Sequence, residues 1–151
     1  MKEKTLDYPL RTAWMSVAKM YNEQASTKGS TMATGFALLS IDPEEGTPST
    51  SLGPKMGIEA TSLSRTLKMM EEKNLIVRKR NPDDGRSVLI HLTEFGQEMR
   101  EFSKEVVLQF DQAVRERIPQ EKLDTFIEVL NSITNLVNSK DWIKRSRLVT
   151  K

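Results

Sequence analysis

The stretch from residue 60 to residue 92, ATSLSRTLKMMEEKNLIVRKRNPDDGRSVLIHL, decides the fold of this 151-residue chain. Its first half has apolar residues at the spacing of one helix face, namely Leu63, Leu67 and Met70, and predicts a helix over residues 60–74. The pattern then changes from helical to strand-like, and this change predicts that a different element follows the helix.

Two short strand-like runs, residues 76–80 and 88–92, follow this helix. Between them lies Asn-Pro-Asp-Asp-Gly at residues 81–85, a sequence rich in turn-forming residues, so we expect a β-hairpin with a charged tip. Ahead of the helix, a tight turn at residues 56–58 separates it from a shorter helix. Short helix, turn, helix and hairpin in this order predict a winged helix-turn-helix.

Amphipathic helices are expected on both sides of this motif. An apolar stripe predicts a first helix within residues 6–28, and two longer helices follow the hairpin, separated by Pro119. Caps are expected at three helix starts. Ser30 and Thr31 can cap a short second helix, Thr47 is expected as an N-cap followed by Pro48 as the first helical residue, and Thr93 can cap the long helix after the hairpin.

The outward face of the helix at 60–74 has the chemistry of a DNA-reading surface. With the apolar face turned to the core, small hydroxyl residues allow close approach to a duplex, and basic residues can reach base edges or phosphates. The candidate contacts on this helix are Thr61, Ser62, Ser64, Arg65 and Lys68.

The charge of the hairpin supports a nucleic-acid partner. Eight basic and five acidic residues between positions 55 and 91 leave +3, although the whole chain carries only +2. Arg78 and Arg80 are expected to contact phosphates, and Arg86 at the tip can enter a narrow minor groove, where the potential is most negative. Asp84 is expected to hold the Arg86 guanidinium through a bidentate pair.

Residues 61–67, 70–78, 84–87 and 92–96 together resemble the MarR (multiple antibiotic resistance regulator) family. The resemblance implies a homodimeric bacterial transcription regulator that binds a pseudo-palindromic site, most often as a repressor. It also implies a dimer interface built from the terminal helices. Many members release DNA when a small aromatic or anionic ligand enters a cleft beside the dimerisation helices, and the same ligand response is expected here.

Four positions depart from the pattern of the family, and the first is Pro54, which interrupts a helix that the family usually keeps continuous. Glu59 stands where relatives place a Ser or Thr cap on the recognition helix, and Gly85 stands where the wing tip is often basic. Asn74 replaces a glycine, and asparagine tolerates the left-handed conformation that this turn requires. These departures concern the DNA contacts rather than the fold class.

The expected architecture is a mainly α fold with a small β-hairpin wing. We expect one MarR-like domain over residues 1–151, with a winged helix-turn-helix lobe at 30–93 and dimerisation helices at 5–29 and 94–140. The apolar faces of terminal helices this long cannot easily be buried against so small a central lobe. Association with a second copy of the chain would bury this apolar surface and stabilise the pair by roughly 25 cal/mol per Å². The alternative is that the last two helices fold back as an intrachain pair.

Candidate effector contacts are three aromatic residues of the first two helices: Trp14, Tyr21 and Phe36. Their spacing fits ordinary core packing equally well. His91, the single histidine, lies within a predicted strand and is expected to be half-buried and structural.

Composition excludes several classes of function. Because the chain has no Cys and one His, thiolate and multi-histidine metal sites are excluded, and neither a metal nor a cofactor is expected. No nucleophile elbow or phosphate-cradling loop is present, so we do not expect an enzyme. The sequence shows no signal peptide and no membrane-spanning run, which predicts a cytoplasmic protein without a membrane partner. A winged-helix module that only assembles proteins, without reading DNA, remains the alternative function.

Overall fold

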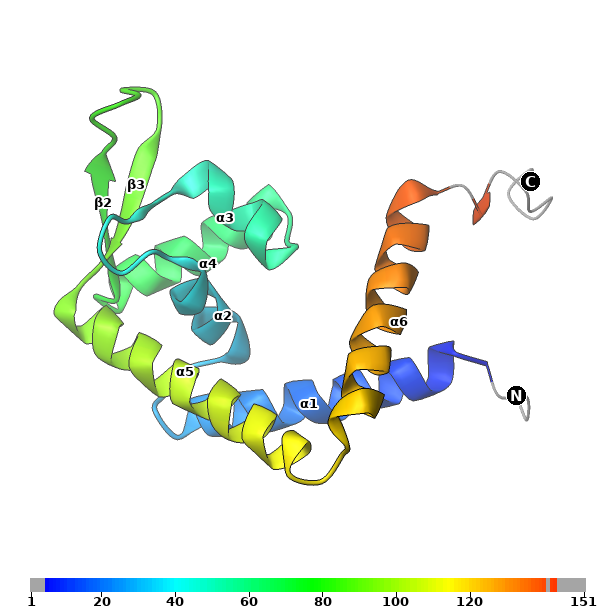
Figure 1. Ribbon diagram of the computed structural model, residues 1–151. Coiled ribbons are helices and arrows are strands. Elements are labelled where there is room, and N and C mark those ends of the chain that lie inside the picture. The colour runs from blue at the N-terminus through cyan, green and yellow to red at the C-terminus, as the bar shows by residue number, and fades with distance from the viewer. Residues whose placement is uncertain (1–4, 141, 144–151) are drawn as a thin grey trace. The chain divides into compact units, whose positions relative to one another are not determined.

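The computed structural model describes residues 5–140 and 142–143, in which the chain forms six helices and three short strands (Figure 1). In chain order the elements are α1 (Asp7–Ser26), α2 (Met32–Ser40), β1 (Thr47–Pro48), α3 (Ser49–Met56), α4 (Ala60–Glu72), β2 (Ile76–Arg80), β3 (Val88–Leu92), α5 (Glu94–Arg115) and α6 (Gln120–Ser139). The chain divides into two compact units, and the boundary between Val107 and Leu108 falls within α5.

The core of the first unit lies where α2, α3 and α4 meet the sheet. The predicted apolar face of α4 is confirmed, because Leu63, Leu67 and Met70 are all buried. They pack in one cluster with Leu38 of α2 and Ile90 of β3, both completely buried. Burial of such side chains contributes about 1.5–3 kcal/mol each. Since the apolar face of α4 is turned to this core, its polar face must point away from it.

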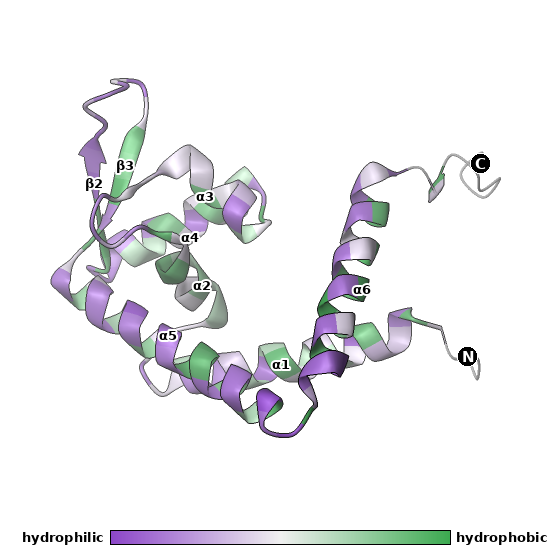
Figure 2. Ribbon diagram, in the orientation of Figure 1, coloured by the Kyte–Doolittle hydropathy of each residue, from purple (hydrophilic) through white to green (hydrophobic). Residues whose placement is uncertain are grey.

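The three strands form one antiparallel sheet in the order β1-β3-β2. The predicted hairpin is confirmed with its predicted bounds: Ile76 lies opposite Leu92, and Arg80 lies opposite Val88. Figure 2 shows that the two strands of the hairpin differ in character, because β2 is largely hydrophilic and β3 hydrophobic. The hairpin therefore has β3 in the middle of the sheet and a basic strand at its edge.

The expectation that Thr47 and Pro48 open a helix is wrong. Both residues pair with β3 as the edge strand β1, and α3 begins at Ser49. The Thr47 hydroxyl does not cap that helix but accepts the backbone N–H of Asp42 at 2.8 Å across the preceding turn. Proline is tolerated at a sheet edge because it has no N–H to donate, so the Thr-Pro pair fits either element.

In the lobe, capping side chains mark the starts of helices, and residues in the left-handed conformation mark their ends. Thr31 and Thr93 are confirmed as N-caps, because each hydroxyl accepts a backbone N–H three residues further on, at 3.2 and 2.9 Å. Gly57 ends α3 with φ +66°, and Asn74 follows α4 with φ +61°. The prediction that Asn74 takes a left-handed conformation is therefore confirmed.

The second unit holds the end of α5 and all of α6, which begins after Pro119 as predicted. In α6 only Leu123 is buried. Figure 2 shows hydrophobic residues recurring along the whole helix. The large apolar side chains that this unit exposes in its described helices are Leu108, Phe126, Ile127, Val129, Leu136 and Val137.

The first helix also has an apolar surface without a cover. No residue of α1 is buried, although the helix is 20 residues long. Leu10, Trp14 and Met15 are between 45% and 62% exposed. Within residues 5–140 and 142–143, no helix is long and apolar enough to cross a membrane.

Candidate nucleic-acid interface

The outward face of α4 presents the five residues that the sequence singles out. Thr61, Ser62, Ser64, Arg65 and Lys68 are all exposed. Neither Arg65 nor Lys68 forms an ion pair with any described residue, so both charges are available to a ligand. Thr66, the remaining hydroxyl of this segment, instead donates to the carbonyl of Ser62 at 3.0 Å. The helix therefore offers small hydroxyls near its start and two free cations further along.

The start of α4 is weakly capped. Glu59 occupies the N-cap position, and its side chain accepts no hydrogen bond from the first turn. The chain reaches this position through the left-handed Gly57 and through Ile58, whose N–H donates to the carbonyl of Gly53 at 3.1 Å. The first backbone N–H groups of α4 are therefore left for water or for an anionic ligand such as phosphate.

The end of α4 is firmly attached to the start of α5. Thr93 donates its hydroxyl to the carbonyl of Asn74 at 2.7 Å and its backbone N–H to the carbonyl of Leu75 at 3.0 Å. Gly96 packs so closely on Leu75 that a Cβ at this position would overlap the Leu75 carbonyl. These contacts fix α4 with respect to the first turn of α5.

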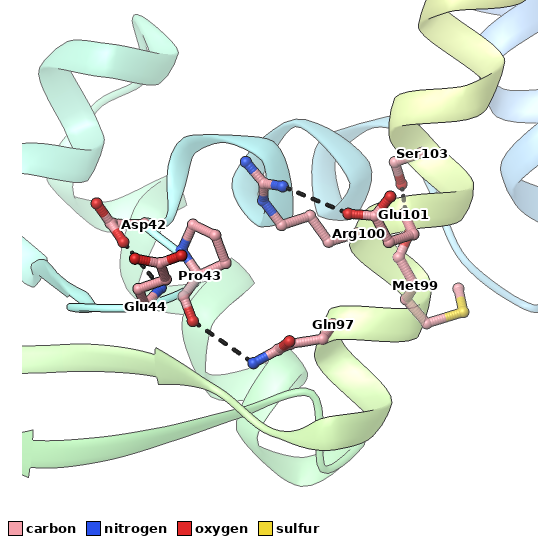
Figure 3. A network of polar contacts seen from close by, with 8 residues as sticks. All are labelled: Asp42, Pro43, Glu44, Gln97, Met99, Arg100, Glu101 and Ser103. Carbon is pink, nitrogen blue, oxygen red and sulfur yellow. Dashed lines mark hydrogen bonds and ion pairs between the residues drawn. The ribbon is translucent and has the colours of Figure 1, made fainter.

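A hydrogen bond also joins the beginning of α5 to the loop before β1 (Figure 3). The side-chain amide of Gln97 donates to the carbonyl of Pro43 at 3.5 Å. Within the loop, the Asp42 carboxylate accepts the backbone N–H groups of Glu45 and Glu44, and these bonds hold the pKa of Asp42 below its ordinary 3.8. The stability from this carboxylate is therefore present above about pH 3.8 and is lost as the pH falls through the lower, folded-state pKa.

The tip of the hairpin is closed by hydrogen bonds of its own side chains. Asn81 donates from its side-chain amide to the Ser87 hydroxyl at 2.9 Å, and its Oδ1 accepts the backbone N–H of Asp83 at 3.0 Å. The backbone N–H of Ser87 donates to the carbonyl of Asp84 at 3.1 Å. Such local bonds replace the sheet ladder and give the loop a defined conformation.

Asp84 plays a different part from the predicted one. Its Oδ1 accepts the backbone N–H of Arg86 at 3.0 Å, and the two side chains form no ion pair. The prediction of a bidentate pair is therefore corrected: the turn places the backbone N–H closer to the carboxylate than the guanidinium. Arg86 is exposed at the tip and keeps its charge free for a ligand.

The two arginines of β2 are in different situations. The Arg78 Nε lies 3.1 Å from the Glu71 carboxylate of α4, with both side chains partly exposed. This pair ties the wing to α4 and partly neutralises the Arg78 charge. Arg80 has no carboxylate partner among the described residues, and its guanidinium lies against Gly85 in the tip. The role of Glu71 could not be predicted from the sequence, because the ion pair joins residues that only folding brings together.

A small apolar cavity lies beside α1, α2 and α5 within the first unit. Tyr21 and Phe36 line it and meet edge to face, with ring centroids 5.6 Å apart. Trp14 is not among its lining residues and is 52% exposed. The free space is only about 30 Å³, which holds a water molecule or two but no aromatic ligand. Lys28 lies near the cavity, with its Nζ 5.5 Å from the centroid of the lining Phe102 ring.

Known proteins are similar to this chain in the winged helix-turn-helix lobe. The model of the MarR family matches residues 31–88. The uncharacterized HTH-type transcriptional regulator YdgJ of Bacillus subtilis (strain 168) is 32% identical over 88 residues, which are 58% of this chain and about half (54%) of YdgJ. The organic hydroperoxide resistance transcriptional regulator of the same organism is 32% identical over 99 residues, covering 66% of this chain and 67% of that protein.

Similarity to solved structures extends beyond the lobe. The transcriptional repressor CouR bound to a 23-mer DNA duplex is 25% identical, with a TM-score of 0.74, and the match covers 87% of this chain and 93% of CouR. CouR from Rhodococcus jostii RHA1 bound to p-coumaroyl-CoA gives 24% identity and a TM-score of 0.77, covering 86% and 92%. The flanking helices therefore share the family fold together with the winged lobe.

Proposed function

Because this chain belongs to the MarR family of DNA-binding transcription regulators, we propose that it is a repressor that binds a pseudo-palindromic operator as a homodimer. The observation that carries this proposal is the outward face of α4, where exposed hydroxyls and two unpaired cations lie beside a basic wing. The cytoplasm, where bacterial operators lie, is then its place of action.

In the proposed complex, α4 lies in the major groove. Thr61, Ser62 and Ser64 allow the start of the helix to come close to the duplex, and Arg65 reaches base edges. Lys68 contacts a phosphate, which contributes affinity without sequence information. The tip of the wing reaches the flanking minor groove, where the negative potential favours Arg86.

The proposed dimer explains the uncovered apolar surfaces. In α1 no residue is buried, and in α6 only Leu123 is buried. Terminal helices of two copies, associated through these surfaces, would remove them from water and stabilise the pair. A two-fold axis between the copies would place the two α4 helices in successive major grooves, roughly 34 Å apart.

The proposed effector site is the cavity lined by Tyr21 and Phe36. CouR is a family relative that binds both DNA and p-coumaroyl-CoA, which supports a ligand response in this chain as well. Because the present free space is only about 30 Å³, a ligand has to separate the two rings as it enters. It then lowers DNA affinity only if it favours a conformation that binds DNA less tightly. Trp14, on the exposed side of α1, belongs to this site only in a ligand-bound conformation.

The test of the proposed function is binding to duplexes selected by the protein from a randomised pool, measured over a range of salt concentrations. Binding through several phosphates must weaken steeply as salt rises. A protein that enriches no sequence, or binds with little dependence on salt, would support the alternative of a winged-helix assembly module and overturn the proposal.

A further inference from the structure

The guanidinium of Arg80 lies close to the point at which a side chain at position 85 would begin. A Cβ built on Gly85 would lie 3.1 Å from the terminal Nη2 of Arg80, 3.5 Å from its Nε and 3.7 Å from its Cζ. The two nitrogens are nearer than Cζ, so the guanidinium meets this position with its Nε–Nη2 edge. Arg80, the last residue of β2, thus carries its charge beyond the strand and into the tip of the wing.

Backbone conformation does not explain why residue 85 is a glycine. In the described chain, Gly29, Gly46 and Gly57 have positive φ angles, whereas Gly85 does not. An ordinary residue could therefore adopt the Gly85 conformation without backbone strain. What glycine provides here is room, because a Cβ at this position would push the exposed Arg80 guanidinium aside by a few tenths of an ångström.

Neighbouring contacts leave the Arg80 charge without a partner. Arg78, two residues earlier and on the same side of β2, is held by Glu71 at 3.1 Å, whereas no described carboxylate pairs with Arg80. Asp84, the acidic residue next to Gly85, has its Oδ1 engaged by the backbone N–H of Arg86. Arg80 and Arg86 are therefore two free cations in one tip whose conformation is fixed by its own hydrogen bonds.

We propose that Arg80 is the second DNA-contacting cation of the wing tip and that it reaches a backbone phosphate through the space left by Gly85. This inference rests on the proposed DNA binding but goes beyond it, because it makes the glycine and the arginine one functional unit. A basic side chain at position 85 and the arginine at position 80 would then be alternative ways to place the same charge.

A rescue experiment tests this unit. The affinity of the full chain for its selected duplex is measured, with its salt dependence, for R80A, G85R and the double variant R80A/G85R. We expect R80A to weaken binding about tenfold and to lower the salt slope by about two, one for each chain of the proposed dimer. G85R should restore most of this loss in the R80A background but add little to the wild-type chain, because the two guanidinium groups then compete for one position.

The control is K79A, which removes one charge from the neighbouring position on the opposite side of β2 and should change affinity less than R80A. Thermal unfolding of each variant checks that the lobe is folded. Equal effects of K79A and R80A, or an equal gain from G85R in both backgrounds, would overturn the inference. If R86A weakens binding and R80A does not, only this inference fails; if the wild-type chain binds no duplex, the proposed function fails with it.

Discussion

At the scale of single residues, Glu59 is the position where the sequence conflicts most with the proposed task. It is the N-cap residue of α4 but accepts no hydrogen bond there, and its negative charge lies where phosphates would approach the helix. We expect E59S to add a cap worth about 1 kcal/mol and to lose a dipole interaction of about 0.5 kcal/mol, for a net gain of roughly 0.5 kcal/mol in the free energy of unfolding.

Urea denaturation measures this gain, and a duplex titration measures the accompanying change in affinity. E59Q is the matched control, because it removes the charge without supplying a short capping oxygen. Both variants should bind DNA more tightly than the wild-type chain, whereas only E59S should be more stable. A stability gain shared by both variants would show that the charge of Glu59, and not the missing cap, limits the stability of α4.

Gly96 is the residue at which a single methyl group should do most damage. Its Cβ would overlap the carbonyl of Leu75, which accepts the backbone N–H of Thr93. Because a backbone carbonyl cannot turn aside as a side chain can, we expect G96A to destabilise the protein by about 2 kcal/mol or more. G35A is the control, since its Cβ would meet only the Ser103 hydroxyl at 3.2 Å. If the two variants had the same denaturation midpoint, the close packing of Gly96 on Leu75 would not be important for stability.

At the scale of elements, α4 and the wing have separate tasks that mutations can distinguish. If Arg65 reads bases from the middle of α4, R65A should weaken binding to the selected duplex by about 1–3 kcal/mol and weaken binding to unrelated DNA much less. K122A, which removes a positive charge from α6 outside the lobe, should affect both duplexes slightly and equally. Parallel losses on the two DNAs in R65A would make Arg65 a phosphate contact instead.

Removal of the wing cation should give a different result. R86A is expected to weaken binding by about 1 kcal/mol or more while the oligomeric state stays unchanged, because Arg86 lies in the exposed tip and takes part in no packing. Anisotropy titration and sedimentation of the same sample measure the two properties. An R86A protein with wild-type affinity at physiological salt would exclude the wing from DNA contact.

Helices and strands can be predicted from the sequence where residues close together in the chain determine them. The period of Leu63, Leu67 and Met70 and the turn residues between β2 and β3 depend on neighbours in the chain, so helix and hairpin were found with small errors. The two-residue strand β1 was missed because Thr47 and Pro48 become a strand only by pairing with β3. The Arg78–Glu71 ion pair and the position of Arg80 over Gly85 likewise depend on contacts that folding creates.

At the scale of the whole molecule, the apolar surface of α6 should hold two chains together. L136E places a charge among exposed apolar side chains and should shift the protein toward monomer without unfolding the winged lobe. N135E adds the same charge at the adjacent polar position and serves as the control. We expect sedimentation to show a loss of dimer in L136E alone, with a matching loss of DNA affinity. A dimer that survives L136E would require a different interface.

In the proposed complex, two copies of α4 are held at the pitch of B-form DNA. This arrangement is tested most directly by the affinity of the wild-type protein for its selected duplex before and after insertion of about half a helical turn, ~5 base pairs, between the half-sites. We expect two chains on the original duplex and a loss of specific binding after the insertion, since one half-site then faces the opposite side of the helix. Unchanged affinity after the insertion, or one chain on each duplex, would contradict it.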